Sequence, residues 1–196
     1  MVGSRVVTEA TSRGHRIRAL SRKPAGDHPN VTPVPVDATD TNALREAVAG
    51  AGAVVVAVRT NPVDEPFLVG TTVAVLDLGL PVLVVGGAGV LRSPADPGLL
   101  VADNPAYVPP GIRPVAAAGL AQLAACRAHP NPDWTYLAPP ALLEPGGRTG
   151  AYLRGTDTLL TGSDGRSWIS AEDLAVAVVD ELERPGGEHL ITVVHR

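Results

Sequence analysis

The amino-acid sequence predicts an α/β fold in which helices cover both faces of an open, doubly wound parallel sheet. Apolar runs with strand and helix periodicity alternate along all 196 residues, which is typical of α/β layers. Apolar residues make up 45% of the chain and aromatic residues only 3%, so Val, Leu and Ala must form most of the core. Small cores of this kind favour strands that are covered by helices on both faces.

The helices are predicted from apolar residues three or four positions apart and from residues typical of helix ends. Gly14 ends the first helix as a C-terminal cap, and Ser170 with Asp173 three residues later is typical of a helix start. The apolar stripes are Val2, Val6, Val7 and Ala10 over residues 2–13; Leu44, Ala47, Val48 and Ala51; Val69, Thr72, Val73 and Leu76 over Pro66–Leu78; Leu120, Leu123 and Ala124 over Val115–Ala128; and Ala175, Val178, Val179 and Leu182.

The strands are predicted from short apolar runs, and two of these runs also indicate a position in the sheet. Pro33 and Pro35 indicate an edge strand, because proline cannot donate to a ladder. Ala53–Val58 is apolar on both faces and therefore predicts a central parallel strand. The expected strands are Arg16–Leu20, Val31–Val36, Ala53–Val58, Pro81–Val85, Trp134–Ala138 and Leu190–Val194, the last of which is expected to close the sheet.

The expected topology is incomplete at one position. Right-handed crossovers predict the strand order 3-2-1-4-5, with ligands bound at the carboxyl ends of the strands. Strand 1 of that order is missing, because the sequence starts inside the first helix. We therefore expect the natural product to start about ten residues earlier, which is enough for a strand and a turn.

The charge and cysteine content narrow the range of partners. The formal net charge is −4, so the sequence predicts no broad basic surface for nucleic acid or an anionic membrane. Cys126 is the only cysteine, which excludes an internal disulfide and indicates a small buried side chain. No signal peptide or membrane-spanning run is found. We expect a cytoplasmic protein, a monomer or homodimer, with small-molecule or protein partners.

Several segments together carry a family resemblance. They are MVGSRVV, HRIRALSRKP, PVDATD, AVVVAV, LVVGGAG, DWTYLAPP and SAEDLAVAVVDEL. In order and spacing the chain resembles the atypical short-chain dehydrogenase/reductase family, in its NmrA-like, NAD(P)H-binding branch. The resemblance implies one Rossmann-like NAD(P)-binding domain over residues 1–196, with a substrate loop at about 139–167. Members begin with a strand and a G-x-x-G-x-x-G turn, and Gly3 aligns with the third glycine, whose role is close helix packing.

The resemblance also implies a cofactor. Arg22 and Lys23 follow the second strand, where cations favour the 2′-phosphate of NADP, although a solvated charge pair is an alternative. In the family the residue that matches Asp37 lies beside the adenine, but Asp37 and Asp40 could equally cap the next helix. Gly86 and Gly87 could admit a flat nucleotide or form an ordinary turn. The candidate cofactor-binding residues are Gly3, Arg22, Lys23, Asp37, Ala38, Ala57, Val58, Arg59, Gly86 and Gly87.

No catalytic residue can be named from the sequence. The wider superfamily uses a Tyr-x-x-x-Lys pair, but Gly111, Pro140 and Thr156 stand four residues after the three tyrosines. The five histidines show no spacing typical of a metal site, so no metal is expected. The Gly- and Pro-rich region 139–167 is predicted as a long functional loop or a small hairpin. Candidate substrate contacts, each of which could also be an ordinary surface residue, are Tyr107, Pro139, Arg148, Tyr152 and Arg154.

The resulting hypothesis is an NADP-preferring oxidoreductase that reduces a small planar acceptor, such as a flavin or quinone. Without the Tyr-x-x-x-Lys pair, hydride transfer would depend on positioning the nicotinamide against an acceptor that needs little acid help. Two alternatives stay open at this point. One is a regulator that binds NAD(P) without turnover, and the other is a chain with impaired cofactor binding.

Overall fold

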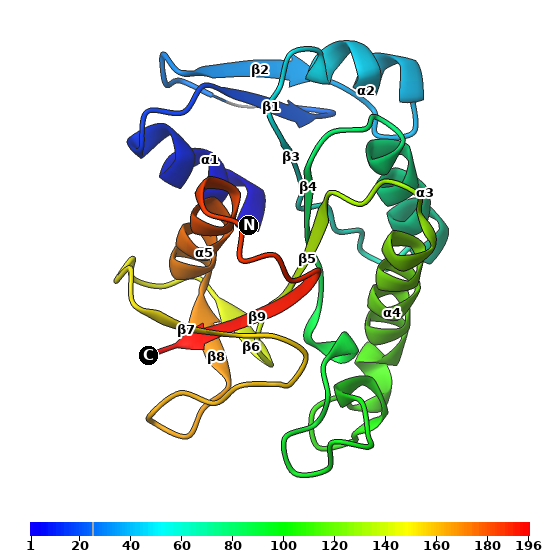
Figure 1. Ribbon diagram of the computed structural model, residues 1–196, viewed down its shortest axis with the longest axis vertical. Coiled ribbons are helices and arrows are strands. Elements are labelled where there is room, and N and C mark those ends of the chain that lie inside the picture. Colours follow the sequence, from blue (N-terminus) through cyan, green and yellow to red (C-terminus); the bar gives the residue numbers. More distant parts are fainter. Residues whose placement is uncertain (25) are drawn as a thin grey trace.

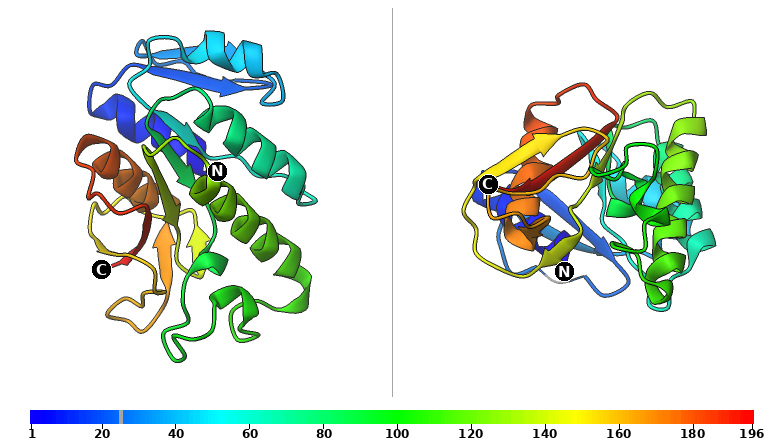
Figure 2. Two further views of the ribbon diagram at one scale, coloured as in Figure 1. Left: turned by 45° about the vertical axis from the view of Figure 1, so that its right-hand side comes forward. Right: turned by 90° about the horizontal axis from the view of Figure 1, so that it is seen from below.

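Helices cover both faces of a central sheet in the computed structural model, which describes residues 1–24 and 26–196. Figures 1 and 2 show α1 and α5 on one face of this sheet and α3 and α4 on the other. The predicted α/β arrangement is therefore confirmed. The helices are α1 (Val2–Ser12), α2 (Thr41–Val48), α3 (Glu65–Leu76), α4 (Arg113–Ala128) and α5 (Ala171–Glu183), with short 3-10 turns at Ala88–Val90, Val101–Asp103 and Pro110–Ile112.

The central sheet has five strands in the order β3-β4-β5-β9-β7. Four of them are parallel, whereas β7 pairs antiparallel with β9. Because β7 forms the outer edge, β9 does not close the sheet, and this part of the sequence prediction is wrong. The five strands are β3 (Val54–Val56), β4 (Val82–Val85), β5 (Trp134–Ala138), β9 (Leu190–His195) and β7 (Tyr152–Gly155).

Two further strands, β1 (Ile17–Ser21) and β2 (Val31–Pro35), form a separate parallel pair. Pro33 and Pro35 are exposed on β2, which among the described residues has a ladder with β1 alone, so the predicted edge position is confirmed. Among the described residues no ladder joins β1 to β3. As a result β3 is the other edge of the five-stranded sheet and not the central strand expected from its apolar sequence.

The region predicted as a loop, residues 139–167, contains more regular structure than expected. It includes β7 and also β6 (Leu142–Glu144), which pairs parallel with β8 (Trp168–Ser170). The strand β7 is only four residues long and is held by a ladder in which Gly155 faces Thr192. Strands this short depend on a distant partner, so local sequence patterns do not predict them.

Two buried clusters form the core, one on each face of the sheet. The larger cluster packs α2, α3 and α4 against the sheet and includes Leu76, Val84 and Tyr136. The second cluster packs α1 and α5 against the opposite face and includes Leu137 and Ile191. Neighbouring residues of a strand point to opposite faces, so Tyr136 and Leu137 belong to different clusters.

Local signals at the helix ends agree with the sequence. Ser170 accepts a hydrogen bond from the backbone N–H of Asp173 at the start of α5, as predicted. Asp40 and Asp64 accept in the same way from the third residue of α2 and α3. Gly14 follows α1 with φ of 88°, a left-handed conformation that favours glycine. In the described part of the chain, no helix is long and apolar enough to cross a membrane.

Candidate functional site

A cavity of about 750 Å³ lies beyond the ends of β1 and β3. Arg22 follows β1 directly, and Arg59 follows β3 by three residues. Both side chains are exposed, and neither makes a hydrogen bond or ion pair with another described side chain. The cavity therefore presents two guanidinium groups that no described side chain pairs with, beside the carboxylates of Asp64 and Glu65. Its lining residues are Arg22, Arg59, Thr60, Asn61, Pro62, Val63, Asp64, Glu65, Pro66, Pro114 and Ala117.

Two acidic residues at or near this cavity accept hydrogen bonds from backbone N–H groups. Asp64 accepts a hydrogen bond from the N–H of Phe67 (3.0 Å) and thereby caps α3. Asp37 accepts from the N–H (3.0 Å) and the hydroxyl (2.8 Å) of Thr39. These hydrogen bonds, followed by a smaller effect of the Arg22 charge, hold the pKa of Asp37 below its usual value. Asp37 and Asp40 were both candidates to cap the next helix, and it is Asp40 that caps α2.

The remaining predicted cofactor-binding residues differ in exposure. Lys23 and Val58 are exposed, whereas Ala38 and Ala57 are half-buried. Gly3 lies near the end of β3, because a Cβ atom added to it would be 3.8 Å from the Cβ of Ala57. That is an ordinary contact distance, so the structure brings the start of α1 close to the strand end but leaves space for an alanine.

The two glycines that follow β4 have different surroundings. A methyl group added to Gly86 would overlap the ring of Tyr136, so packing alone requires a glycine there. A methyl group added to Gly87 would meet no heavy atom within 4 Å. The N–H of Gly87 donates to the hydroxyl of Tyr136 at 3.3 Å. Only Gly87 therefore has an open side toward which a ligand could lie.

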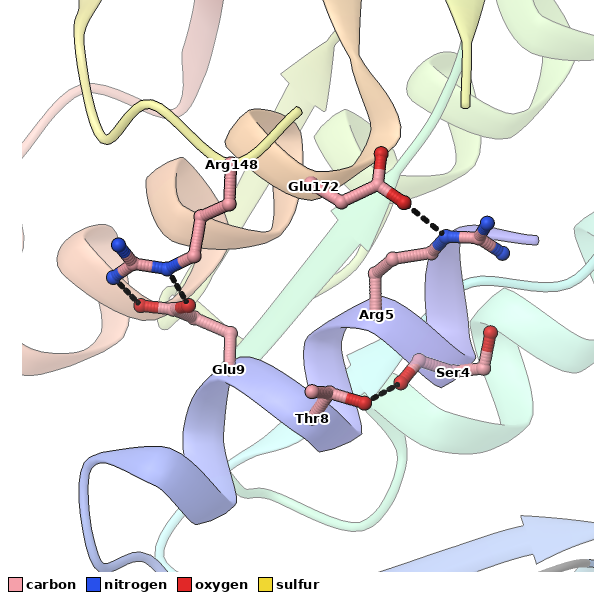
Figure 3. Close-up of a pocket in the computed structure, with 6 residues that line it drawn as sticks. All are labelled: Ser4, Arg5, Thr8, Glu9, Arg148 and Glu172. Carbon is pink, nitrogen blue, oxygen red and sulfur yellow. Dashed lines mark hydrogen bonds and ion pairs between the residues drawn. The ribbon is translucent and has the colours of Figure 1, made fainter. Parts of the chain in front are cut away.

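Arg148 and Tyr152 are tied to the protein itself. Arg148 donates twice to the carboxylate of Glu9 on α1, at 2.6 and 2.8 Å, and Figure 3 shows this pair. Tyr152 donates to Asp180 on α5 at 2.7 Å. Both side chains are held by carboxylates of the protein, and a substrate contact by either stays a prediction. Arg154 is likewise paired with Glu181 and Glu188.

The pairs around Arg148 belong to a second, smaller cavity of about 260 Å³. Arg5 on α1 pairs with Glu172 on α5 at 3.0 Å, and Arg148 with Glu9. Glu9 is only 4% exposed. Its pKa is lowered mainly by the hydrogen bond from Arg148, which together with Arg13 outweighs the opposing effect of burial. This cavity has charged walls, but the charges neutralise one another.

Asp173 organises the segment of residues 146–150. The sequence indicated only that Asp173 belongs to a helix start, and not that it holds a distant segment. It is completely buried and accepts from the N–H and hydroxyl of Thr149 (2.7 and 2.6 Å) and from the N–H of Gly150 (2.8 Å). Glu172 accepts from the N–H of Gly146 at 2.8 Å. The two carboxylates at the start of α5 therefore fix this segment against the helix. The acid pair at 172–173 was the only available signal.

The other predicted positions lie at the same end of the sheet or in the core. Pro139 is buried directly after β5, and Tyr107 is half-buried against the larger core cluster. Cys126 is fully buried, as predicted, and burial raises the pKa of its thiol to about 11. A thiol in this state is a poor nucleophile at neutral pH.

Helices on both faces of a mostly parallel sheet, with a cavity past the strand ends that contains Arg22 and Arg59, define a Rossmann-like nucleotide-binding fold. A family model described as NAD(P)H-binding matches residues 1–185. The chain belongs to this NAD(P)H-binding family, which confirms the predicted fold class and resemblance.

Relatives are similar along nearly their whole length. The uncharacterized protein YwnB of Bacillus subtilis (strain 168) is 32% identical over 190 residues, which cover 93% of this chain and 88% of YwnB. A crystal structure of a candidate exported protein from Burkholderia pseudomallei is 34% identical, with a TM-score of 0.88 over 100% of this chain and 95% of that one. A candidate NADH-flavin reductase from Streptococcus pneumoniae TIGR4 is 27% identical, with a TM-score of 0.86 over 100% and 94%.

Proposed function

We propose that this protein is an NADPH-dependent oxidoreductase that reduces a planar acceptor such as a flavin or quinone. The observation that carries the proposal is the cavity that contains Arg22 and Arg59, two guanidinium groups without a partner among the described side chains. Unpaired arginines in a cavity suit a phosphate group, because the planar guanidinium can donate two hydrogen bonds to it. Arg22, with Lys23 beside it, would hold the 2′-phosphate that distinguishes NADP from NAD.

The shape and the walls of the cavity fit the adenosine end of such a cofactor. Its volume of about 750 Å³ is within the range of roughly 300–1,000 Å³ that is usual for ligand pockets. Pro62, Val63 and Pro114 supply apolar surface for a base, and Asp37 lies close enough to Arg22 for their charges to interact. These residues would bind and orient the cofactor, which supplies a hydride when it is bound.

Two of the three tyrosines are poorly suited to supply a proton. The hydroxyls of Tyr136 and Tyr152 are committed to protein partners, and burial is the largest cause of the raised pKa of both. A tyrosine that passes a proton to a substrate needs a lowered pKa. An acceptor that takes a hydride with little acid help therefore fits best. The flavin reductase description of the Streptococcus pneumoniae relative supports this acceptor class.

Calorimetric titration with NADPH and NADH tests the cofactor preference. Arg22→Gln should weaken NADPH binding by about tenfold or more, as expected for a lost charge-assisted hydrogen bond, and should change NADH binding little. Arg127→Gln, an exposed arginine in the last turn of α4, is the control and should bind both nucleotides like the wild type. Equal losses of NADPH and NADH affinity in Arg22→Gln would contradict a 2′-phosphate contact.

Turnover separates an enzyme from a regulator that only binds nucleotide. Oxidation of NADPH should be followed with riboflavin, flavin mononucleotide and a set of quinones as acceptors. Tight NADPH binding without oxidation by any of these acceptors would favour the regulatory alternative. The proposal also includes a cytoplasmic location and a monomer or homodimer, and the single cysteine supports the location.

A further inference from the structure

Tyr136 joins three parts of the molecule at the end of the sheet. It lies on β5, and its side chain is fully buried. Its hydroxyl accepts from the N–H of Gly87 (3.3 Å), in the turn after β4, and donates to the carbonyl of Gly119 (3.2 Å), in α4. A buried hydroxyl is costly unless it is hydrogen-bonded, so these two bonds fix the side chain in place.

The same side chain determines the shape of the turn after β4. The ring fills the space that a side chain at Gly86 would need. Gly87 is held by its N–H in an extended conformation, with φ of −133° and ψ of 157°. The direction in which a Cβ atom of Gly87 would point is open, with no heavy atom within 4 Å of that position. The turn therefore has an inner side attached to Tyr136 and an outer side that is free to contact a ligand.

We propose that Tyr136 is a positioning residue of the nucleotide site, which holds the Gly86-Gly87 turn so that a bound dinucleotide passes along the open side of Gly87. This inference rests on the proposed function, because it assumes that a dinucleotide binds along the strand ends. Tyr136 does not touch the cofactor in this arrangement. It acts through the backbone of Gly87, whose N–H is directed into the protein and away from the ligand.

Tyr136→Phe tests this role because it removes the hydroxyl and keeps the ring. Two measurements are needed, the dissociation constant of NADPH and the hydrogen-exchange rate of the Gly87 amide. The variant should exchange the Gly87 amide faster and bind NADPH about three- to tenfold more weakly, the range that a lost neutral hydrogen bond corresponds to. Leu137→Val is the matched control. It alters the other core cluster from the same strand, so stability should fall while NADPH affinity stays unchanged.

A second variant covers the case in which Tyr136→Phe does not fold. Gly87→Ala adds a methyl group on the open side, where it contacts no protein atom, so stability should be kept while NADPH affinity falls. Wild-type NADPH affinity in Gly87→Ala, or in a folded Tyr136→Phe, would overturn this inference and leave the proposed function intact. If the wild-type protein binds neither NADPH nor NADH, the proposed function itself is wrong.

Discussion

Charged side chains gather in two regions of this molecule, and the regions differ in whether these side chains have protein partners. Around α1, α5 and residues 146–150, nearly every charge has a protein partner: Arg148 pairs with Glu9, Arg5 with Glu172, and Asp173 accepts three hydrogen bonds. In the cavity past β1 and β3, the side chains of Arg22 and Arg59 have none among the described side chains.

This difference separates stability from function. A charge with a buried partner stabilises the folded state, and its loss leaves the partner unsatisfied. An exposed charge in a cavity contributes little to folding and is available to a ligand. Mutations in the first region should therefore change the free energy of unfolding, whereas mutations in the second should change ligand binding.

The largest effect is expected for Asp173→Ala. Removal of this buried carboxylate leaves the hydroxyl of Thr149 and two backbone N–H groups without their acceptor. The free energy of unfolding should fall by about 3 kcal/mol or more, because three hydrogen bonds to one charged group are lost and each contributes roughly 1.5–3 kcal/mol. Urea unfolding at neutral pH measures this change. The control is Asp157→Ala, whose partner Arg92 is half exposed and which should cost at most about 1 kcal/mol. Equal losses in the two variants would contradict the comparison.

Gly86→Ala and Gly87→Ala extend the same comparison to two neighbouring backbone positions. Gly86→Ala forces a methyl group against the ring of Tyr136 and should lower the free energy of unfolding by about 1–3 kcal/mol, as overpacking does. Gly87→Ala meets open space and should change it by less than about 0.5 kcal/mol. Thermal unfolding of both variants checks this. A large loss in Gly87→Ala would show that its open side is filled by the protein.

Much of the fold was predictable from the sequence because the signals are local. Pro33 and Pro35 indicate an edge strand by their chemistry alone, and β2 is an edge. Ser170 indicates a helix start, and it caps α5. The position of β7 was not predictable, since its ladder joins Gly155 to Thr192, and neither segment shows this pairing in its own sequence.

Site residues at the ends of strands could be predicted from the sequence, whereas the partners of residues in long loops could not. Arg22 was a candidate because of its position directly after a strand, and the structure brings it to a cavity as expected of that position. Arg148 and Tyr152 were candidates because of their residue type and their place in the predicted substrate loop, neither of which reveals distant partners. Glu9 lies 139 residues from Arg148 and Asp180 lies 28 residues from Tyr152, so only the folded structure shows that these side chains are satisfied.

A smaller effect on the free energy of unfolding is expected when the pH is lowered and Glu9 becomes protonated. The pKa of Glu9 is held below its usual value of 4.5, chiefly by Arg148. Its contribution to stability is therefore present above pH 4.5 and is lost as pH falls through the lower pKa of the folded state. Because Arg148 is more than half exposed, the contribution should be on the order of 1 kcal/mol. Glu9→Gln should accordingly lower the stability at pH 7 and flatten the fall in stability below about pH 4.5. An unchanged pH profile would show that the pair contributes nothing.

The smallest effect on the free energy of unfolding is expected for Arg22→Gln. This variant tests directly whether Arg22 serves ligand binding and not stability. If Arg22 has no protein partner, its replacement should change the free energy of unfolding without nucleotide by less than about 0.5 kcal/mol. With saturating NADPH, the wild type should be stabilised more than the variant, because a ligand that binds only the folded state stabilises it according to its affinity. Urea unfolding with and without NADPH measures both quantities. A large loss of stability in the nucleotide-free variant would mean that Arg22 stabilises the folded state, as Arg148 does. The cation in the cavity would then serve folding and not ligand binding.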